Sequence, residues 1–168
     1  PIANTIIGTN YSLNTANGAL TFSAAVDAIP TSPIAPSLTI SSGTGVVSFG
    51  GAIGQSNALS SLSVTSTAAS TILTGSVSTL GAQTFTNKIT LAANTNFTGS
   101  SFSFAATGVQ VDGVAGTNYS SGIYFSDVGT YTNPTIDGAK FINLGSFATG
   151  ATAPINLTGA FTTTGAQT

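Results

Sequence analysis

The residues able to carry acid–base or metal chemistry are few. The 168-residue chain contains four Asp, two Lys and no Glu, Arg, His or Cys. Asp112, Asp127 and Asp137 are close enough in sequence to share a face, but Asp112 and Asp137 each precede a Gly, and Asp-Gly is a turn dipeptide. General acid–base catalysis needs groups that titrate near the working pH, and calcium needs six or more oxygen ligands. We therefore predict turns here, with no catalytic activity, no metal and no cofactor.

Three tyrosines are the best candidates for contacts with a ligand or a partner. Tyr119, Tyr124 and Tyr131 lie in residues 118–138, a stretch that the rest of the chain does not repeat. Tyr is favoured at binding surfaces because it offers a large contact area with few rotatable bonds. It is also a common strand residue. The sequence therefore leaves two interpretations open: a surface for cell-surface glycans or proteins, and ordinary strand positions.

Charged side chains are scarce along the whole chain. They make up 4% of its residues, whereas ordinary soluble domains contain roughly 25%. Two Lys and no Arg cannot neutralise several phosphates, so we expect no nucleic-acid partner. A surface built from hydroxyls and amides has little charge repulsion to keep copies apart, and we therefore expect the chain to associate with copies of itself.

Apolar residues occur in short runs, which Ser, Thr, Asn and Gly interrupt. A membrane helix needs about 18 or more consecutive apolar residues, so we predict no membrane span. Cys is absent, and no disulfide framework therefore indicates the compartment. Richness in Ser, Thr, Asn and Gly without Cys is common in exported chains, which favours an extracellular or cell-surface location.

The elements that must position any site are short strands. Apolar and polar residues alternate in short runs, as half-buried strands require, and helical periodicity is nearly missing. The predicted strands are Leu20–Val26, Leu38–Ile40, Val47–Phe49, Leu62–Val64, Ile89–Leu91, Phe102–Phe104, Val109–Val111, Ile123–Phe125, Ile142–Leu144 and Ile155–Leu157.

One stretch occurs twice. Leu73–Thr84 reads LTGSVSTLGAQT and Leu157–Thr168 reads LTGAFTTTGAQT, with eight of twelve positions identical at an offset of half the chain. We interpret each copy as a strand followed by a Gly-Ala-Gln-Thr turn. The recurrence predicts a single segment spanning residues 1–168, made of two degenerate repeats, 1–84 and 85–168.

Two all-β architectures can use such strands. In a parallel β-solenoid, coils of roughly twenty residues stack about 4.8 Å apart. In a pilin-like β-sandwich, a neighbouring subunit donates a strand, here Ile2–Leu13. The spacing favours the solenoid, because the alternating runs that begin at Leu20, Leu38 and Leu62 follow one another at intervals close to one such coil. We predict about seven to nine coils and keep the sandwich as the alternative.

Several segments resemble a known family. Gly43–Gly51 (GTGVVSFGG), Ala58–Ser66 (ALSSLSVTS) and Thr79–Asn96 (TLGAQTFTNKITLAANTN) are similar to the repeats of filamentous-haemagglutinin-like exoproteins and giant adhesins. The resemblance implies a right-handed parallel β-helix that is secreted and displayed as a long cell-surface fibre. Residues 118–138 do not share it.

Both ends of the sequence read as strand or repeat, with Ile2, Ile6 and Ile7 at the start and Phe161 near the finish. The open end of a solenoid exposes unpaired backbone groups, which favour the addition of another strand layer. We therefore expect a structural protein of an extracellular filament, with subunits or repeats of a longer chain joined end to end by β-strand pairing. The alternative is a stalk or display segment of a secreted adhesin that binds host or neighbouring cells.

Overall fold

A computed structural model describes residues 2–30, 34–67 and 70–103 together with their side chains. The described residues contain nineteen strands and no helix. Beyond residue 103 the description covers the backbone of the strand segments 110–112, 122–126, 135–137, 140–144, 146–149 and 161–163.

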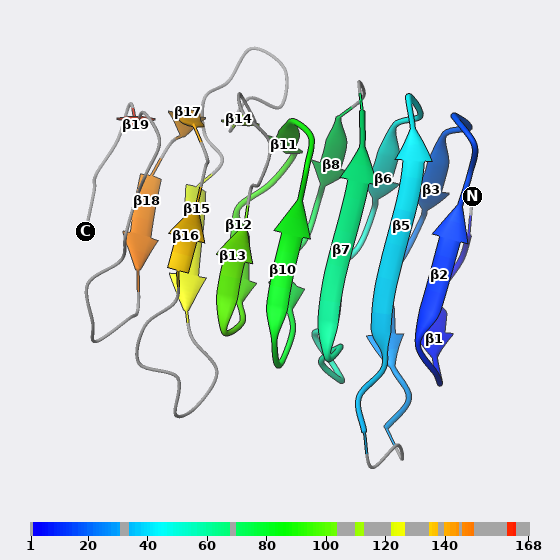
Figure 1. The fold of residues 1–168 in the computed structure, drawn as a ribbon. Coiled ribbons are helices and arrows are strands. Elements are labelled where there is room, and N and C mark those ends of the chain that lie inside the picture. The colour runs from blue at the N-terminus through cyan, green and yellow to red at the C-terminus, as the bar shows by residue number, and fades with distance from the viewer. Residues whose placement is uncertain are drawn as a thin grey trace.

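Every strand pair in the described part of the chain is parallel. Successive coils lie side by side, so that the strands follow one another along the stack in the order of the sequence (Figure 1). This arrangement confirms the predicted all-β parallel solenoid. The alternative, a β-sandwich completed by an exchanged strand Ile2–Leu13, is wrong, because that segment pairs in parallel within its own chain.

The first face of the solenoid is a six-stranded sheet. Its strands alternate between inward apolar and outward polar side chains, as the burial pattern of the longest strand shows. In order along the stack, the strands are β2 (Tyr11–Asn14), β5 (Ser37–Gly43), β7 (Ser61–Ser66), β10 (Ala82–Phe85), β13 (Ser101–Ser103) and β16 (Thr135–Asp137).

The second face is a seven-stranded sheet, whose strands are mostly short because the chain turns a corner at either end of each. In order, they are β3 (Leu20–Phe22), β6 (Val47–Phe49), β8 (Thr71–Leu73), β11 (Ile89–Leu91), β14 (Gln110–Asp112), β17 (Lys140–Leu144) and β19 (Phe161–Thr163).

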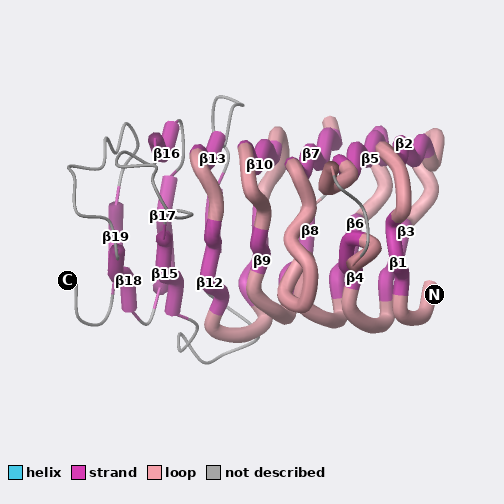
Figure 2. The backbone as a smooth tube through the Cα atoms, turned by 90° about the horizontal axis from the view of Figure 1, so that it is seen from below, coloured by secondary structure: helices cyan, strands magenta, loops and turns pink. Residues whose placement is uncertain are grey.

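The third face consists of two parts joined through a single residue. Ile53 forms parallel bridges to Val26 on one side and to Val77 on the other, so the two parts make one continuous layer. Figure 2 shows the strands of this face from below. They are β1 (Thr5–Ile7), β4 (Val26–Ala28), β9 (Val77–Ser78), β12 (Thr95–Thr98), β15 (Gly122–Ser126) and β18 (Ser146–Thr149).

The core lies between the three faces and consists of columns of inward side chains. Parallel pairing in register places residues of the same face above one another, as in the column of Ile40, Val64 and Phe85. In the seven-stranded sheet Phe22 stacks on Phe49, with ring centroids 5.1 Å apart and planes inclined by 3°. All these residues are almost completely buried. The coils therefore share one continuous apolar core, which no single coil could form alone.

Several corners of the coil admit only glycine, and Gly54 and Gly75 are two examples. Gly54 has a φ of +65°, and a Cβ there would collide with the carbonyl oxygen of Ser78. A Cβ on Gly75 would lie 2.7 Å from the backbone nitrogen of Ala52. Backbones of neighbouring coils thus touch at these corners, which is a physical reason for small residues in the connections between strands.

The coils are more variable in length than predicted. Leu38, Leu62, Gln83 and Phe102 hold the same register position in successive coils, and each of these coils is shorter than the one before it. The next coil, from Phe102 to Ile136, is much longer than any of them. About four complete turns are described with their side chains, up to residue 103, and the predicted count of seven to nine coils is not supported. That prediction assumed a constant coil length, whereas the connections vary.

Both copies of the Gly-Ala-Gln-Thr motif were predicted to be turns; the prediction is wrong for the first copy, and the second, residues 165–168, lies outside the described residues. Residues 82–85 form β10, with Gln83 fully buried and the corner lying before them, at Gly81. The two copies of the repeat also lie in different sheets, because Val77 belongs to β9 and its counterpart Phe161 belongs to β19. The second copy, half the chain further on, does not fall at the same place in the coil as the first, because the coil length varies.

Candidate functional site at the N-terminal end

The N-terminal end of the solenoid presents a strand edge on each of its three faces. β2 is the edge strand of the six-stranded sheet, and β1 is the edge strand of the third face. On the seven-stranded sheet Ile2 covers β3 through a single parallel bridge to Phe22. Residues 2–14 therefore form the surface of this end, which we call the N-terminal edge.

The backbone of β1 is bonded on one side only. The N–H of Thr5 donates to the carbonyl oxygen of Ala25 at 3.0 Å, and the carbonyl oxygen of Ile7 accepts from the N–H of Ile29 at 2.9 Å. Successive residues of a strand direct their backbone groups to opposite sides. The N–H and carbonyl of Ile6, between these two residues, therefore point away from β4, toward the open side.

β2 has the same arrangement. The N–H of Thr15 donates to the carbonyl oxygen of Ser41 at 3.0 Å, and Leu13 is in register with Ile40 of β5. By the same alternation, the backbone groups of Ser12 and Asn14 point away from β5. Two of the three faces thus offer donors and acceptors in the spacing that another parallel strand requires.

A small hollow lies at this end, between the N-terminal edge and the first core residues. Its volume is about 210 Å³. The wall is mostly aliphatic and aromatic, so the hollow suits an apolar side chain rather than a polar ligand. It is lined by Ile2, Thr5, Ile6, Ile7, Gly8, Thr9, Tyr11, Leu13, Phe22 and Leu38.

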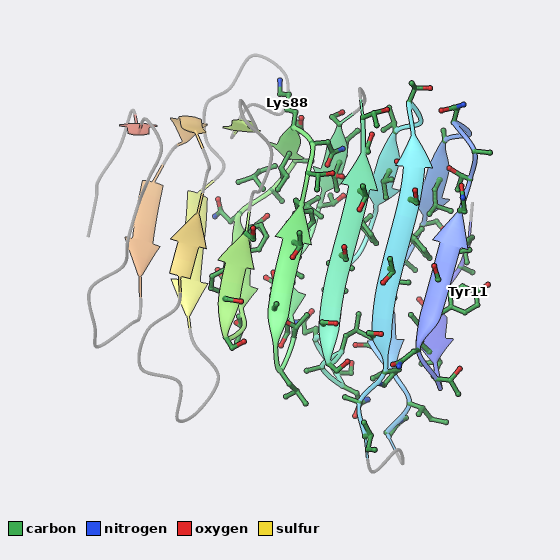
Figure 3. All side chains as sticks on the ribbon, viewed as in Figure 1. Tyr11 and Lys88 are labelled. Carbon is green, nitrogen blue, oxygen red and sulfur yellow. The ribbon has the colours of Figure 1, made fainter. Side chains whose placement is uncertain are left out.

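Exposed apolar side chains gather at the same end. Of the six large apolar residues that are exposed in the described part of the chain, five lie between residues 2 and 34, in the first coil and its connection to the second. Ile6 is 60% exposed and Tyr11 is 51% exposed. Figure 3 shows Tyr11 directed outward at this end of the stack. Scattered single apolar residues are ordinary on a protein surface, but Ile2, Ile6 and Tyr11 line one hollow, and such a contiguous group is typical of an interaction site.

The residues predicted to form the assembly ends differ in their exposure to solvent and in their position. Ile2 and Ile6 are exposed, as an assembly surface requires. Ile7 is only 5% exposed and belongs to the core, because the alternation that turns Ile6 outward turns Ile7 inward. Phe161 lies in β19, the edge strand at the opposite end of the seven-stranded sheet.

Of the three tyrosines proposed for ligand contact, the described residues include one, Tyr124. Tyr124 lies in β15, in register with Asn96 of β12, and Asn96 is exposed on the third face. Tyr119 and Tyr131 lie outside the described residues. The described part of the chain therefore places one of the three on a face of the solenoid.

Sequence reasoning did not single out Tyr11 and Leu13, which line the hollow together with Ile2 and Ile6. The signal was present, because Tyr11 and Leu13 alternate with polar residues as a strand does. Only the alternative β-sandwich gave this segment a role, as a strand donated to another subunit, and neither architecture predicts the inward position of Leu13. Leu38 and Phe22 were predicted as strand residues, but their place at the first coil follows only from the register.

Electrostatics contribute little to this end. Two charged side chains are described, Asp27 and Lys88, and Lys88 projects from the stack away from the N-terminal edge (Figure 3). Asp27 is 7% exposed, and its Oδ1 accepts hydrogen bonds from the N–H groups of Ser56 at 2.9 Å and Asn57 at 3.4 Å. This carboxylate therefore holds a connecting segment of the next coil in place.

Among the described residues, no three acidic side chains come together in a group that could hold a metal ion. Nor does this part of the chain contain a helix long and apolar enough to cross a membrane. The open edges and the apolar hollow of the N-terminal edge are thus the features that bear on function.

Comparison with known proteins adds no relative to this description. No protein-family model matches the chain, and neither a curated protein nor a solved structure matches it.

Proposed function

We propose that the chain is a structural segment of an extracellular or cell-surface filament, in which subunits or repeats are joined end to end by β-strand pairing. The observation that carries this proposal is the N-terminal edge. It combines backbone groups directed to the open side at Ile6, Ser12 and Asn14 with an apolar hollow and exposed Ile2, Ile6 and Tyr11. The partner is a coil of another copy or of an adjacent repeat.

The strand order supports such a junction because the two ends complement each other. The six-stranded sheet ends at β2 and β16, the seven-stranded sheet at β3 and β19, and the third face at β1 and β18. Since all strand pairs are parallel, a coil added at the N-terminal edge continues each sheet in the same direction. Strand addition of this kind takes its affinity from main-chain hydrogen bonds and its specificity from pockets for alternate side chains.

Burial of apolar side chains supplies the rest of the driving force. Full burial of a large apolar side chain contributes about 1.5–3 kcal/mol relative to full exposure. Ile6 and Tyr11 are more than half exposed and Ile2 is 40% exposed, so each would contribute part of that amount. The low charge of the chain, 4% of residues, leaves little repulsion to oppose the contact.

The resemblance to filamentous-haemagglutinin-like exoproteins agrees with this function and adds finer features to the proposal. These are a right-handed coil, secretion, and display on the cell surface as a fibre. The parallel solenoid supports the resemblance in architecture only, because a fold does not by itself define a function.

The decisive experiment is electron microscopy of the purified chain beside an Ile6→Pro variant. Proline removes the N–H that points to the open side, and it leaves intact the bonds that Thr5 and Ile7 make with the neighbouring coil. We expect filaments from the unmodified chain and short particles from Ile6→Pro. Ile6→Ala is the matched control, because it loses apolar area but keeps the N–H, and its filaments should form at higher protein concentration.

A loss of filaments counts only if Ile6→Pro keeps the far-ultraviolet circular dichroism of the unmodified chain. Filaments of unchanged length in a folded Ile6→Pro variant would exclude strand pairing at this edge. A chain that stays dispersed as 16.4 kDa monomers at high concentration would exclude a filament built from separate copies.

The second candidate function is a stalk or display segment of an adhesin that contacts cell-surface glycans or proteins. One observation favours it: Tyr124 is in register with the exposed Asn96 on the third face. Changing Tyr119, Tyr124 and Tyr131 together to Ser should then abolish binding to cells or glycans and leave filament formation unchanged. Equal binding by the triple variant would remove this candidate.

A further inference from the structure

The outer face of the six-stranded sheet carries hydroxyl side chains in continuous register. One row runs along the stack across five successive strands, with one hydroxyl in each strand. Ser12 and Thr39 are exposed, and the later members are partly exposed. The members of this row, which we call the hydroxyl row, are Ser12, Thr39, Ser63, Thr84 and Ser103.

Polar residues of similar size flank the hydroxyl row. Asn14, Ser41 and Thr65 form a second register series on one side, and Ser37 and Ser61 are paired on the other. From β2 to β13 no strand of this sheet contains a charged residue. The first charge is Asp137 of β16, which is in register with Ser103. The result is an uncharged polar face over five successive strands, whose residues lie far apart in the sequence.

We propose that this face is a lateral contact surface for a second copy of the chain, so that filaments pair side by side. A hydroxyl is both a donor and an acceptor of hydrogen bonds, so a face of hydroxyls complements an identical face. Two copies also have the same spacing of about 4.8 Å between coils, because strand pairing fixes it. Rows of two facing copies can therefore meet at every coil and not only at one.

The size of the face determines when pairing occurs. The five strands of this face are three to seven residues long. At about 3.3 Å per residue and about 4.8 Å between strands, they present on the order of 400 Å² per copy. Stable protein–protein contacts bury about 800 Å² per partner. A single copy is therefore too small to pair, whereas a filament presents the same face many times over and gains from multivalency. In this respect the inference rests on the proposed end-to-end assembly.

The test compares two double variants that carry the same added charge. Thr39→Lys/Thr84→Lys places two charges in the hydroxyl row. Thr21→Lys/Thr90→Lys is the matched control, because Thr21 and Thr90 are outward residues in the middle of β3 and β11 on the seven-stranded sheet. In electron micrographs we expect paired or bundled filaments from the unmodified chain and from the control, and single filaments of normal length from Thr39→Lys/Thr84→Lys.

A charge-swap experiment gives a positive signal that misfolding cannot imitate. Filaments of Thr39→Lys/Thr84→Lys are mixed with filaments of Thr39→Asp/Thr84→Asp, each assembled separately beforehand. We expect pairs to return in the mixture, since opposite charges then face one another, and to be absent from either variant alone. Pairs that persist in the Lys variant, or a mixture that stays single, would overturn the lateral contact and leave the end-to-end contact intact.

Two other outcomes would show which of the two proposals, end-to-end assembly or lateral pairing, is wrong. If no filament forms from the unmodified chain, end-to-end assembly fails, and lateral pairing of filaments fails with it. If the unmodified chain shows thermal hysteresis that Thr39→Lys/Thr84→Lys loses, while no filaments pair, the hydroxyl row binds ice rather than a second copy, and the proposed partner is wrong.

Discussion

The Nε2 of Gln83 donates a hydrogen bond to the carbonyl oxygen of Thr98 at 2.8 Å, and this contact ties the six-stranded sheet to the third face inside the core. Gln83 stands in register between Leu62 and Phe102, where neighbouring coils carry apolar side chains. Its Oε1, in contrast, has no hydrogen-bond partner among the described residues. The Nε2 of this buried amide is therefore hydrogen-bonded, whereas its Oε1 lowers the stability of the fold because it is buried without a partner.

Replacing Gln83 with Leu is expected to change the free energy of unfolding by less than about 1 kcal/mol. The carbonyl oxygen of Thr98 also accepts from the N–H of Thr79 at 2.8 Å, so it keeps a partner, and removal of the unsatisfied Oε1 offsets the lost bonds. Gln83→Ala leaves a cavity instead and should cost about 2–4 kcal/mol. Urea unfolding of both variants gives the comparison. Equal losses in the two would mean that the amide bonds dominate.

The stacked pair Phe22 and Phe49 should be the most sensitive apolar contact of the first two coils. Both rings are nearly fully buried with centroids 5.1 Å apart, so Phe49→Ala should lower the free energy of unfolding by about 3–5 kcal/mol. A double-mutant cycle with Phe22→Leu and Phe49→Leu should give a coupling energy of about 0.5–1.5 kcal/mol. Additive losses would show that the stacking itself contributes nothing beyond burial.

Much of the architecture was predictable because it depends on local alternation. Leu38–Ile40, Val47–Phe49 and Ile89–Leu91 were predicted as strands, and all three are strands with their apolar residues inward. The spacing of these alternating runs also favoured a stacked β architecture. These runs are visible in sequence because each involves residues next to one another.

The missed features depend on residues that are distant in sequence. A buried Gln is uncommon, so Gly-Ala-Gln-Thr read as a turn, although the core position of Gln83 follows from its register with Leu62. The hydroxyl row could not be found either, since a whole coil separates Thr39 from Ser63 and another, of different length, separates Ser63 from Thr84. Packing sets the register between coils of variable length, and no local sequence pattern predicts it.

The end of the stack was predictable only in part for the same reason. Ile2, Ile6 and Ile7 were treated alike as apolar residues near the start of the chain. A strand with a period of two separates them, so that Ile6 faces solvent and Ile7 faces the core. The hollow between β1, β2 and the first core residues needs the three-dimensional arrangement.

Gly54 offers a sharp test of the corner geometry. Its φ of +65° and the carbonyl oxygen of Ser78 both exclude a Cβ, so Gly54→Ala should be destabilising by more than about 1 kcal/mol. Gly8→Ala is the control, because a Cβ there meets only the Cδ1 of Ile29, at 4.0 Å, and its effect should stay within about 0.5 kcal/mol. Thermal unfolding followed by circular dichroism measures both. A mild Gly54→Ala would contradict the close approach of the two coils.

Asp27 should stabilise the connection between Ile53 and Ala58 through its carboxylate. The side chain is 7% exposed, and Oδ1 accepts from the N–H groups of Ser56 and Asn57. Hydrogen bonds to a charged group contribute about 1.5–3 kcal/mol when well formed. We expect Asp27→Ala to lose an amount in that range, because the two N–H groups lose their acceptor.

Asp27→Asn separates the acceptor from the charge, since its amide oxygen can still accept both bonds. It should therefore lose less than Asp27→Ala. Amide hydrogen exchange at Ser56 and Asn57 reports the bonds directly: exchange should be fast in Asp27→Ala and slow in the unmodified chain, with Asp27→Asn between them. Unchanged protection in Asp27→Ala would show that the backbone bond from Ala28 to Asn57, at 3.0 Å, holds the segment without the carboxylate.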